Sequence, residues 1–590
     1  MEGSRFCQSA TNAIPIVSNQ SHMSDNVDKS SHDKKNKNIK MQVIDALIQA
    51  LAERGVRKVY GVPGDYVLTV FDRFEKSPIE MICTAGEEGA GFAADAHARL
   101  HGLGVAVVTY GVGALKLLNP VAGAFVERSP LLVISGSPGV RESDEHALLH
   151  HQIRASDTQQ RFFNEICAET ACLNSVRTAG GEMIKVLEAM ARESRPGYIE
   201  LPRDCLTRDL HWPLNTKPED KPVHVIPESL NSYAYKLLEW LRKRKNPLVI
   251  AGVEIARFGL GSILLQILER EGWPVVTSLS GKSILPEFHP QHLGVYEGAM
   301  SNNEICERVR NSDGLLIIGM PFGDLDTGIF TMTFNEDQCI NVDIDHGVRW
   351  KGEQEEALDP LLLLRIWEGE SQNKKIDMTI HSNEFQVKKN QLCFTPFKDK
   401  GITTIRLIEA IDSILKKDDV VLVDPGDSLF ASATLKLPES TDFLTSGYWA
   451  SLGFALPGSV GAWGARPDHQ PVVMLGDGSF LMSAIELATI ARYHIPALIM
   501  ILDNEGYGTE RPMMDGPFND VQPVNHVGFA HSIGVKDAVR VITEEQLWDA
   551  LKTFAPNRKG PVLISVKLPN DDCSDALSRL TEALGKRVKS

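Results

Sequence analysis

The sequence lacks three features that would each point to a particular class of protein. It has no apolar run of about 18 residues and no apolar signal-peptide core, so it gives no support for a membrane-spanning or secreted protein. Its nine cysteines, spread from Cys7 to Cys573, form no C-x-x-C pair and no regular framework, which is typical of reduced thiols. A net charge of −16 without a basic stripe argues against a nucleic-acid-binding surface. We therefore expect a cytoplasmic protein without nucleic-acid or membrane partners.

Composition and linker-like stretches divide the chain into sections. With 590 residues, 43% hydrophobic and 23% charged, the chain is long enough for about three or four globular domains. The first 40 residues are rich in Ser, Asn, Asp and Lys and cannot bury enough apolar surface to fold. A polar, Pro-rich stretch at 211–227 and a charged stretch at 368–400 separate the rest. The predicted units are a disordered tail at 1–40, domains at 41–215, 228–370 and 395–575, and a C-terminal tail at 576–590.

Apolar runs alternate with amphipathic helical segments in all three predicted domains. The runs at 104–109, 131–135 and 315–320 are almost continuously apolar, as expected for strands that are buried on both faces of a parallel sheet. Helical periodicity is found between such runs, for example at 43–54 and 404–415. The alternation predicts an α/β fold with three tandem, doubly wound parallel-sheet domains.

Asp477 and Asn504 lie 27 residues apart, each at the end of an apolar strand. The predicted βαβ unit around them has a strand at 471–475, a helix at 484–493 and a strand at 495–502. Because a right-handed crossover places the carboxyl ends of neighbouring parallel strands side by side, the two side chains should converge. Their carboxylate and amide oxygens, with a loop carbonyl such as that of Gly506, form an oxygen set suited to Mg²⁺.

The residues around Asp477 also point to a phosphate group. In the segment Gly-Asp-Gly-Ser, the backbone N–H groups of Gly478 and Ser479 can approach phosphate oxygens closely. A Gly-Asp-Gly triplet alone is equally compatible with an ordinary strand turn, so the spacing to Asn504 is essential to the interpretation. With that spacing, the segment resembles the thiamine-diphosphate motif, which opens with Gly-Asp-Gly and closes with Asn.

Two adjacent acids, Glu87 and Glu88, are followed by a run of small residues. Taken alone, acids at a helix start usually stabilise the helix dipole at the surface. The segment nevertheless resembles the cofactor-activating glutamate of pyruvate and indolepyruvate decarboxylases, where the acid lies eight residues before the Asp of an Ala-Ala-Asp triplet. Counting back from Asp95 identifies Glu87. The resemblance implies that Glu87 exchanges a proton with the aminopyrimidine ring, which enables the cofactor to form its reactive ylide.

Four more polar residues extend the resemblance. Asp65 ends the segment Gly-Val-Pro-Gly-Asp, His150 and His151 are adjacent, and Glu510 ends the segment Tyr-Gly-Thr-Glu. Individually, Asp65 could be a turn former, the histidines a satisfied polar pair, and Glu510 an ion-pair partner of Arg511. Together they resemble the thiamine-diphosphate-dependent 2-oxo acid decarboxylases of the pyruvate, indolepyruvate and phenylpyruvate group. In that family these positions imply an acid–base ring around the reacting carbon.

The resemblance covers residues 41 to 568 and implies a pyrimidine-binding, a middle and a diphosphate-binding domain, in that order. It also implies thiamine diphosphate and Mg²⁺ as cofactors, and a homodimer or dimer of dimers with shared active sites. Leu452 is the candidate apolar wedge that folds the cofactor into a V, with core packing as the alternative. The expected cofactor-binding residues are Glu87, Asp427, Ala450, Leu452, Asp477, Gly478, Ser479, Asn504 and Gly506, of which Asp477, Asn504 and Gly506 bind the metal.

The resemblance implies a 2-oxo acid as the substrate, which we expect to be converted without oxidation into an aldehyde and CO₂. Two positions that are bulkier in pyruvate-specific relatives are Thr509 and Leu429 here, and Met513 is a third predicted pocket residue. Smaller side chains favour an aromatic or branched 2-oxo acid such as indolepyruvate or phenylpyruvate. Alternatives are a pyruvate decarboxylase and a carboligase of the acetohydroxy acid synthase kind, although a synthase should lack the paired histidines. A non-catalytic scaffold would be expected to have lost Glu87 or the metal pair.

Overall fold

The structure is a computed structural model that describes residues 38–144, 148–213, 216, 226–371 and 393–589. Most of the predicted tail at 1–40 lies outside these residues. Its last part does not, because Asn38 begins β1 (Asn38–Gln42), which pairs antiparallel with β8 (Asp209–Pro213). The two-stranded sheet corrects two predicted boundaries: ordered structure begins before residue 41, and residues 211–213 belong to a strand rather than to a linker.

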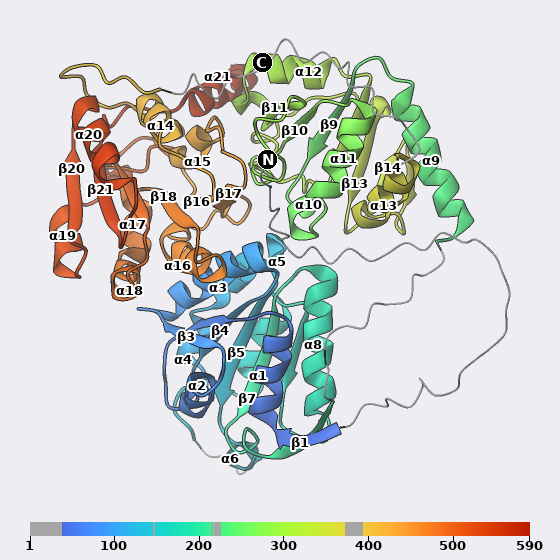
Figure 1. Ribbon diagram of the computed structural model, residues 1–590, viewed down its shortest axis with the longest axis vertical. Helices are drawn as coiled ribbons and strands as arrows, with labels where there is room; N and C mark the ends of the chain where they lie inside the picture. Colours follow the sequence, from blue (N-terminus) through green and yellow to red (C-terminus); the bar gives the residue numbers. More distant parts are fainter. Residues whose placement is uncertain (1–37, 145–147, 214–215, 217–225, 372–392, 590) are drawn as a thin grey trace, which may run out of the picture.

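The N-terminal domain is a six-stranded parallel sheet that is covered on both faces (Figure 1). Its strands, in spatial order, are β3 (Glu80–Cys83), β2 (Lys58–Gly61), β4 (Gly104–Val108), β5 (Leu131–Ser137), β7 (Gly197–Pro202) and β6 (Glu169–Cys172). Its helices are α1 (Val43–Glu53), α2 (Leu68–Glu75), α3 (Glu87–His101), α4 (Val112–Leu115), α5 (Leu118–Val126), α6 (Val140–Asp144), α7 (Thr158–Asn164) and α8 (Ala179–Glu193). Alternate residues of β4 face opposite apolar clusters: Val105 and Val107 pack with α1 and α8, whereas Ala106 and Val108 pack with α3 and α5.

The middle domain has a seven-stranded sheet that is only partly parallel. Its strands, in spatial order, are β11 (His292–Val295), β10 (Val275–Thr277), β9 (Pro247–Ala251), β12 (Gly314–Ile318), β13 (Cys339–Asp343), β14 (Gly347–Trp350) and β15 (Glu353–Glu355). The last two pair antiparallel, so the sheet is parallel as predicted except at this edge. The helices are α9 (Glu228–Arg242), α10 (Glu254–Arg257), α11 (Gly261–Glu271), α12 (Asn303–Arg310) and α13 (Pro360–Ser371).

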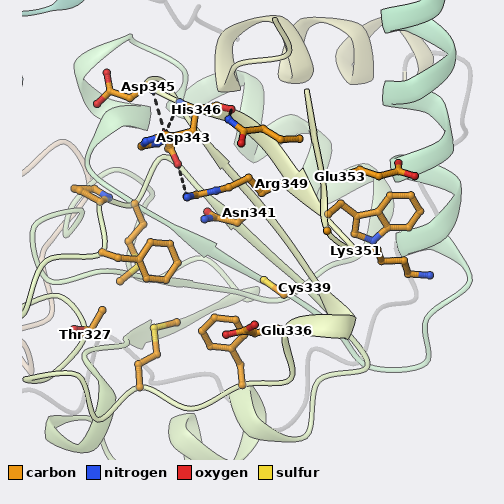
Figure 2. Close-up of a pocket in the computed structure, with 18 of the residues that line it drawn as sticks. Thr327, Glu336, Cys339, Asn341, Asp343, Asp345, His346, Arg349, Lys351 and Glu353 are labelled. Atoms are coloured by element: carbon orange, nitrogen blue, oxygen red, sulfur yellow. Dashed lines mark hydrogen bonds and ion pairs between the residues drawn. The ribbon is translucent and has the colours of Figure 1, made fainter. Parts of the chain in front are cut away.

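A pocket of about 810 Å³ lies in the middle domain, beside β13 and β14 (Figure 2). In it, the Asp343 carboxylate accepts a hydrogen bond from Arg349 at 2.6 Å and interacts with the His346 ring at 2.8 Å. None of the residues predicted to act on a cofactor or substrate lines this pocket.

The C-terminal domain is a six-stranded, fully parallel sheet. Its strands, in spatial order, are β17 (Asp442–Thr445), β16 (Asp419–Val423), β18 (Gln470–Gly476), β19 (Leu498–Asp503), β21 (Val562–Lys567) and β20 (Asp537–Val541). Its helices are α14 (Thr404–Asp412), α15 (Asp427–Ser432), α16 (Ala455–Ala465), α17 (Asp477–Ser483), α18 (Leu487–Arg492), α19 (His526–Ser532) and α20 (Glu544–Phe554). The predicted helix at 484–493 corresponds to a 3₁₀ turn (Ala484–Glu486) followed by α18, and a separate helix, α17, precedes it and begins at Asp477 itself.

The last described segment is a helix, α21 (Asp575–Lys589), where a tail at 576–590 was predicted. Its residues Ala576, Leu577 and Leu580 are buried in the apolar cluster that also holds one face of β16 and β18. The helix therefore belongs to the packed C-terminal domain.

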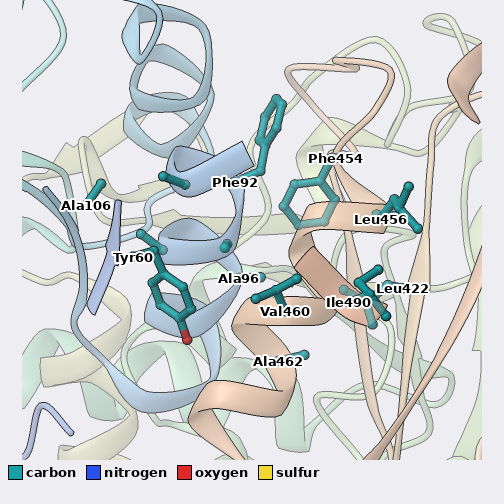
Figure 3. Packing of buried hydrophobic residues seen from close by; sticks show 14 of the residues in the cluster. Tyr60, Phe92, Ala96, Ala106, Leu422, Phe454, Leu456, Val460, Ala462 and Ile490 are labelled. Atoms are coloured by element: carbon teal, nitrogen blue, oxygen red, sulfur yellow. The ribbon is translucent and has the colours of Figure 1, made fainter. Parts of the chain in front are cut away.

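The N- and C-terminal domains meet along α3 and α16, which share one apolar cluster (Figure 3). Phe92 of α3 packs edge to face on Phe454, the residue just before α16, with ring centroids 5.8 Å apart. The helices touch backbone to backbone, because a Cβ placed on Gly461 would lie only 1.8 Å from the carbonyl oxygen of Ala93. This contact fixes the position of α3, which begins with Glu87, against the C-terminal domain.

No helix in the described part of the chain is both long enough and apolar enough to cross a membrane.

Candidate active site

Asp477 and Asn504 follow two adjacent strands at the same edge of the C-terminal sheet. Strands β18 and β19 are parallel neighbours, with Gly476 opposite Leu502. The Asp477 carboxylate accepts the backbone N–H of Gly478 at 2.8 Å and that of Glu505 at 2.7 Å. Since Glu505 directly follows Asn504, the second bond ties the two loops together.

The chemistry around Asp477 fits a divalent cation with an attached diphosphate. Burial raises the pKa of the Asp477 carboxyl to about 6, and within the described residues it forms no ion pair with a basic side chain. The predicted ligands Asn504 and Gly506 would add an amide and a carbonyl oxygen, the donor type that Mg²⁺ prefers. A Cβ placed on Gly426 or Gly476 would meet no atom within 4 Å, so there is open space at the ends of β16 and β18.

The residues expected to face the phosphates are both buried, but one of their amides is already used. The N–H of Gly478 donates to the Asp477 carboxylate, and a Cβ on Gly478 would lie 2.5 Å from the Tyr507 ring. Ser479 is buried as well. Gly478 is thus explained by its close contact with Tyr507, and the contacts of both residues with a diphosphate stay a prediction.

Asp65, His150 and His151 converge at the end of the N-terminal sheet. Their ligand-type atoms all lie within 4.8 Å of one another, and His150 Nε2 is hydrogen-bonded to Asp65 Oδ2 at 2.5 Å. The ring of Tyr66 stacks on that of His150 at 4.9 Å. Burial alone would raise the pKa of Asp65, but the hydrogen bond and charge of His150 outweigh it and lower the pKa. Asp65 and His150 can therefore share a proton, and His151 lies close to both.

Glu87 is the first residue of α3, and it is buried, whereas Glu88 is exposed. Its Oε2 lies 2.8 Å from Lys116 Nζ. The helix start is capped from the C-terminal domain, where Glu486 accepts the backbone N–H groups of Gly86 at 2.8 Å and Ala85 at 3.2 Å. The difference in burial supports the choice of Glu87 over Glu88.

A turn after β4 links Glu87 to Asp65, His150 and His151, which we call the acid–base cluster. A Cβ on Gly113 would lie 3.5 Å from Glu87 Oε1, and one on Gly111 would lie 2.5 Å from the carbonyl oxygen of His151. A Cβ on Gly64, which precedes Asp65, would lie 2.5 Å from Thr109. Glu87 and the acid–base cluster therefore surround the same turn of the N-terminal domain.

The segment 445–455, which we call the cofactor loop, holds the predicted residues Ala450 and Leu452. Ala450 has a φ of 55°, a left-handed conformation that costs a residue with a Cβ free energy and is typical of constrained sites. On one side, buried Asp424 accepts the N–H groups of Gly453 at 3.0 Å and Ala455 at 2.7 Å. Burial raises the pKa of Asp424 to about 7.

On the other side, the N-terminal domain holds the cofactor loop. Glu127, buried at the end of α5, accepts the N–H groups of Tyr448 at 2.7 Å and Trp449 at 3.0 Å through Oε1. Arg99 donates to the carbonyl oxygen of Thr445 at 2.6 Å and lies 3.6 Å from Glu127 Oε2. Sequence reasoning missed Glu127, Arg99, Asp424 and Glu486; no local motif marks Glu127, whereas Asp424 lies in the same Asp-Pro-Gly-Asp segment as Asp427.

Asp427 is engaged elsewhere in the structure. Its carboxylate accepts the backbone N–H of Ser574 at 2.7 Å and the Ser574 hydroxyl, and burial raises its pKa to about 6. Ser574 precedes α21, so Asp427 holds the start of the C-terminal helix. A contact between Asp427 and the diphosphate stays a prediction. Asp427 would have to make it in addition to its contact with Ser574.

The remaining predicted residues lie on the C-terminal domain with very different exposure. Leu429 is fully buried in its apolar core, Thr509 is partly exposed, and Met513 is 71% exposed, so their place in a substrate pocket stays a prediction. Glu510 is exposed, and Arg511 pairs with Asp515 and Asp520 instead. Among the described residues of one chain, no hydrogen bond or ion pair joins Glu510 to the acid–base cluster.

Comparisons with known proteins identify the family of this chain. Family models of the thiamine pyrophosphate enzymes match residues 41–160 (N-terminal TPP binding domain), 235–353 (central domain) and 424–566 (C-terminal TPP binding domain). An indole-3-pyruvate decarboxylase from Azospirillum brasilense is 31% identical over 550 residues, which cover 92% of this chain and 98% of the relative.

Two further relatives also match this chain over most of their length. An alpha-keto-acid decarboxylase from Mycobacterium tuberculosis is 30% identical, with 92% of this chain and 96% of the relative covered. Pyruvate decarboxylase 4 from Arabidopsis thaliana is 28% identical, with 92% of each chain covered. The chain therefore belongs to the thiamine pyrophosphate enzyme family, as a thiamine-pyrophosphate-dependent 2-oxo acid decarboxylase.

Proposed function

We propose that this enzyme decarboxylates an aromatic or branched 2-oxo acid, such as indolepyruvate or phenylpyruvate, to the aldehyde and CO₂ in the cytoplasm. The observation that carries the proposal is the convergence of Asp65, His150 and His151 beside Glu87 at one end of the N-terminal sheet. Thr509 and the name of the Azospirillum relative support the larger substrate. The second candidate is pyruvate, which the name of the Arabidopsis relative supports.

The chain's own residues would divide the work as follows. Asp477, Asn504 and Gly506 would hold Mg²⁺, which would neutralise the charge of the diphosphate. Bound thiamine diphosphate supplies the carbon nucleophile and the electron sink. Glu87 would hold a proton at N1′ of the pyrimidine ring, in place of its contact with Lys116.

Proton transfer at the substrate would be carried out by the acid–base cluster together with Glu510. His150 and His151 can carry a proton on a ring nitrogen, and Asp65 keeps the His150 ring oriented through their hydrogen bond. Glu510 would complete this set with a carboxyl group that can protonate the product carbon. The Ala450 carbonyl and the Leu452 side chain would support the folded cofactor from the cofactor loop.

Two chains would complete each active site, in a homodimer or dimer of dimers. Three apolar side chains just after Asp477 are strongly exposed in the single chain: Leu481 at 42%, Met482 at 57% and Ile485 at 56%. Val112, beside the turn that carries Gly111 and Gly113, is 51% exposed. Exposed apolar side chains gathered beside a site are typical of a surface that a partner covers.

Profiling of substrates tests the proposed reaction. With Mg²⁺ and thiamine diphosphate supplied, we expect CO₂ and aldehyde in equal amounts, and a kcat/KM for indolepyruvate or phenylpyruvate ~10- to 200-fold above that for pyruvate. The variant Thr509→Ile should lower the preference for the larger substrate over pyruvate, because the bulkier side chain would reduce the volume of the pocket. An acetohydroxy acid product would show a synthase instead, and a preference for pyruvate would overturn the substrate assignment.

Glu127 offers a separate test of the cofactor loop. We expect Glu127→Ala to lower kcat by ~10- to 100-fold, because small misplacements of a catalytic constellation have effects of this size. Glu127→Gln keeps an oxygen at Oε1 that accepts both N–H groups, so it should retain most of the activity.

The near-ultraviolet circular dichroism of the bound cofactor should change in Glu127→Ala and not in Glu127→Gln. Glu165→Ala, an exposed glutamate of the same domain, serves as the control. Equal activity of the alanine variant and the unaltered enzyme would show that Glu127 does not position the loop.

A further inference from the structure

The acid–base cluster has the composition of a transition-metal site. It offers two imidazole nitrogens and one carboxylate oxygen, from two separate segments, with all three ligand atoms within 4.8 Å of one another. The side chains of Asp65 and His150 are 49% and 57% exposed, so an ion from solution can reach them.

We infer that Asp65, His150 and His151 form a second metal site, selective for Zn²⁺ or a similar transition ion, and that occupancy of this site inhibits the decarboxylase. The inhibition rests on the proposed role of these residues in catalysis, whereas the binding does not. The site differs in chemistry from the one around Asp477, so the same protein would respond to two metals in opposite ways.

The donor atoms decide between the two metals. Mg²⁺ demands octahedral oxygen ligands and binds imidazole poorly, which suits Asp477, Asn504 and Gly506. Zn²⁺ accepts nitrogen and oxygen from three protein side chains and keeps a fourth position for water or another ligand. Excess Mg²⁺ should therefore leave the histidine site to zinc.

The surrounding structure holds both imidazoles close to a binding arrangement. His151 has a φ of 69° and packs against Gly111, whose N–H donates to Gln159 at 2.6 Å. The His150 ring lies on Tyr66, with an angle of 30° between the ring planes. Gly111 thus holds the backbone of His151, and Tyr66 holds the ring of His150.

Only a small movement is needed to admit the ion. A tetrahedral Zn²⁺ with ligands at about 2.0–2.2 Å holds them about 3.3 Å apart. The hydrogen bond between His150 Nε2 and Asp65 Oδ2, at 2.5 Å, would open by less than about 1 Å, and the His151 ring would turn inward. Two exposed side chains and one half-buried ring can make these rotations.

Zinc at this position would remove the groups that handle protons at the substrate. Both imidazoles would be committed to the ion, and the Asp65 carboxylate would no longer orient His150. A 2-oxo acid could still approach the fourth position of the ion through its carboxylate, but proton transfer would be lost. We therefore expect reversible loss of kcat that a chelator restores.

The test uses the holoenzyme saturated with Mg²⁺ and thiamine diphosphate. Zn²⁺ is titrated against a competing zinc-binding dye, and decarboxylation is followed over the same concentrations. We expect one additional Zn²⁺ per chain and half-inhibition at the concentration that half-fills the site. Co²⁺ in place of Zn²⁺ should give the visible absorption bands of an ion with a low coordination number. These bands report binding without any measurement of activity.

Variants separate this site from others. Asp65→Asn and His151→Gln should weaken Zn²⁺ binding by at least ~10²-fold, since even groups outside the ligand shell contribute ~10- to 100-fold. His531→Gln, an exposed histidine of α19, should bind zinc as the unaltered chain does. Circular dichroism of each variant verifies that it is folded.

Two results would overturn the inference. One is zinc binding that survives both Asp65→Asn and His151→Gln, which would place the ion elsewhere. The other is inhibition accompanied by release of Mg²⁺ and cofactor, which would place zinc at Asp477. If the holoenzyme decarboxylates no 2-oxo acid, the proposed function fails, and the dye and Co²⁺ titrations still decide the metal site.

Discussion

Replacement of Asp477 by alanine is expected to abolish the binding of Mg²⁺ and thiamine diphosphate together. Asp477 is the only carboxylate in the proposed metal set, and its hydrogen bonds to Gly478 and Glu505 hold the neighbouring loops. Without it, a divalent ion loses its one anionic protein ligand, and the diphosphate loses the ion that neutralises it. We expect the affinity of the apo-enzyme for the cofactor to fall by more than ~10²-fold in calorimetric titration.

Two further variants sharpen this experiment. Asp477→Asn keeps acceptor oxygen for the loop but removes the charge, so it should bind cofactor weakly while the fold is retained. Asp468→Ala removes an exposed carboxylate from the same domain and should bind cofactor normally. Undiminished cofactor binding by Asp477→Ala would rule out the proposed metal site.

Glu87→Gln is expected to lower kcat by ~10²- to 10⁴-fold while cofactor binding stays largely intact. The amide has the size of the acid and can occupy the same position at the start of α3, but it cannot exchange a proton with the pyrimidine ring. Single-turnover kinetics with saturating cofactor measure the effect directly. Glu88→Gln is the matched control, because Glu88 is exposed and contacts Asn119. An unchanged kcat in Glu87→Gln would remove this residue from the mechanism.

A mixture of these two inactive variants tests whether subunits share their sites. If Glu87 of one chain serves the cofactor held by Asp477 of another, a mixed dimer contains one site with both residues intact. Unfolding and refolding the two proteins together should then restore part of the activity. No recovery, despite mixed dimers in native mass spectrometry, would place both residues of a site in the same chain.

Much of the fold could be predicted because apolar runs in the sequence mark many of its strands. Runs such as 104–109 are apolar throughout, and the corresponding β4 is buried on both faces. The antiparallel strands β14 and β15 were missed because they are short and partly polar. The helix α21 was missed although its apolar residues recur at helical spacing, since the polar residues between them suggested a tail.

Local motifs also led to the candidate site, within limits. Strand ends were sufficient to bring Asp477 and Asn504 to adjacent loops, because parallel strands leave little freedom there. The bond between Glu127 and the cofactor loop spans 321 residues of sequence, so no local pattern could indicate it. The same applies to Glu486, which caps α3 from 400 residues away.

The close contact between α3 and α16 has a practical consequence for anyone who redesigns this enzyme. A methyl group on Gly461 would collide with the Ala93 carbonyl oxygen, and α3 begins with Glu87 whereas α16 follows the segment that holds Leu452. A library that varies positions 93 and 461 would therefore displace both Glu87, the proposed acid, and Leu452, the proposed wedge, even though the varied positions are remote from the substrate. Diversity is better directed to the segment around Thr509 and Met513, where side chains reach solvent and backbone packing imposes fewer demands.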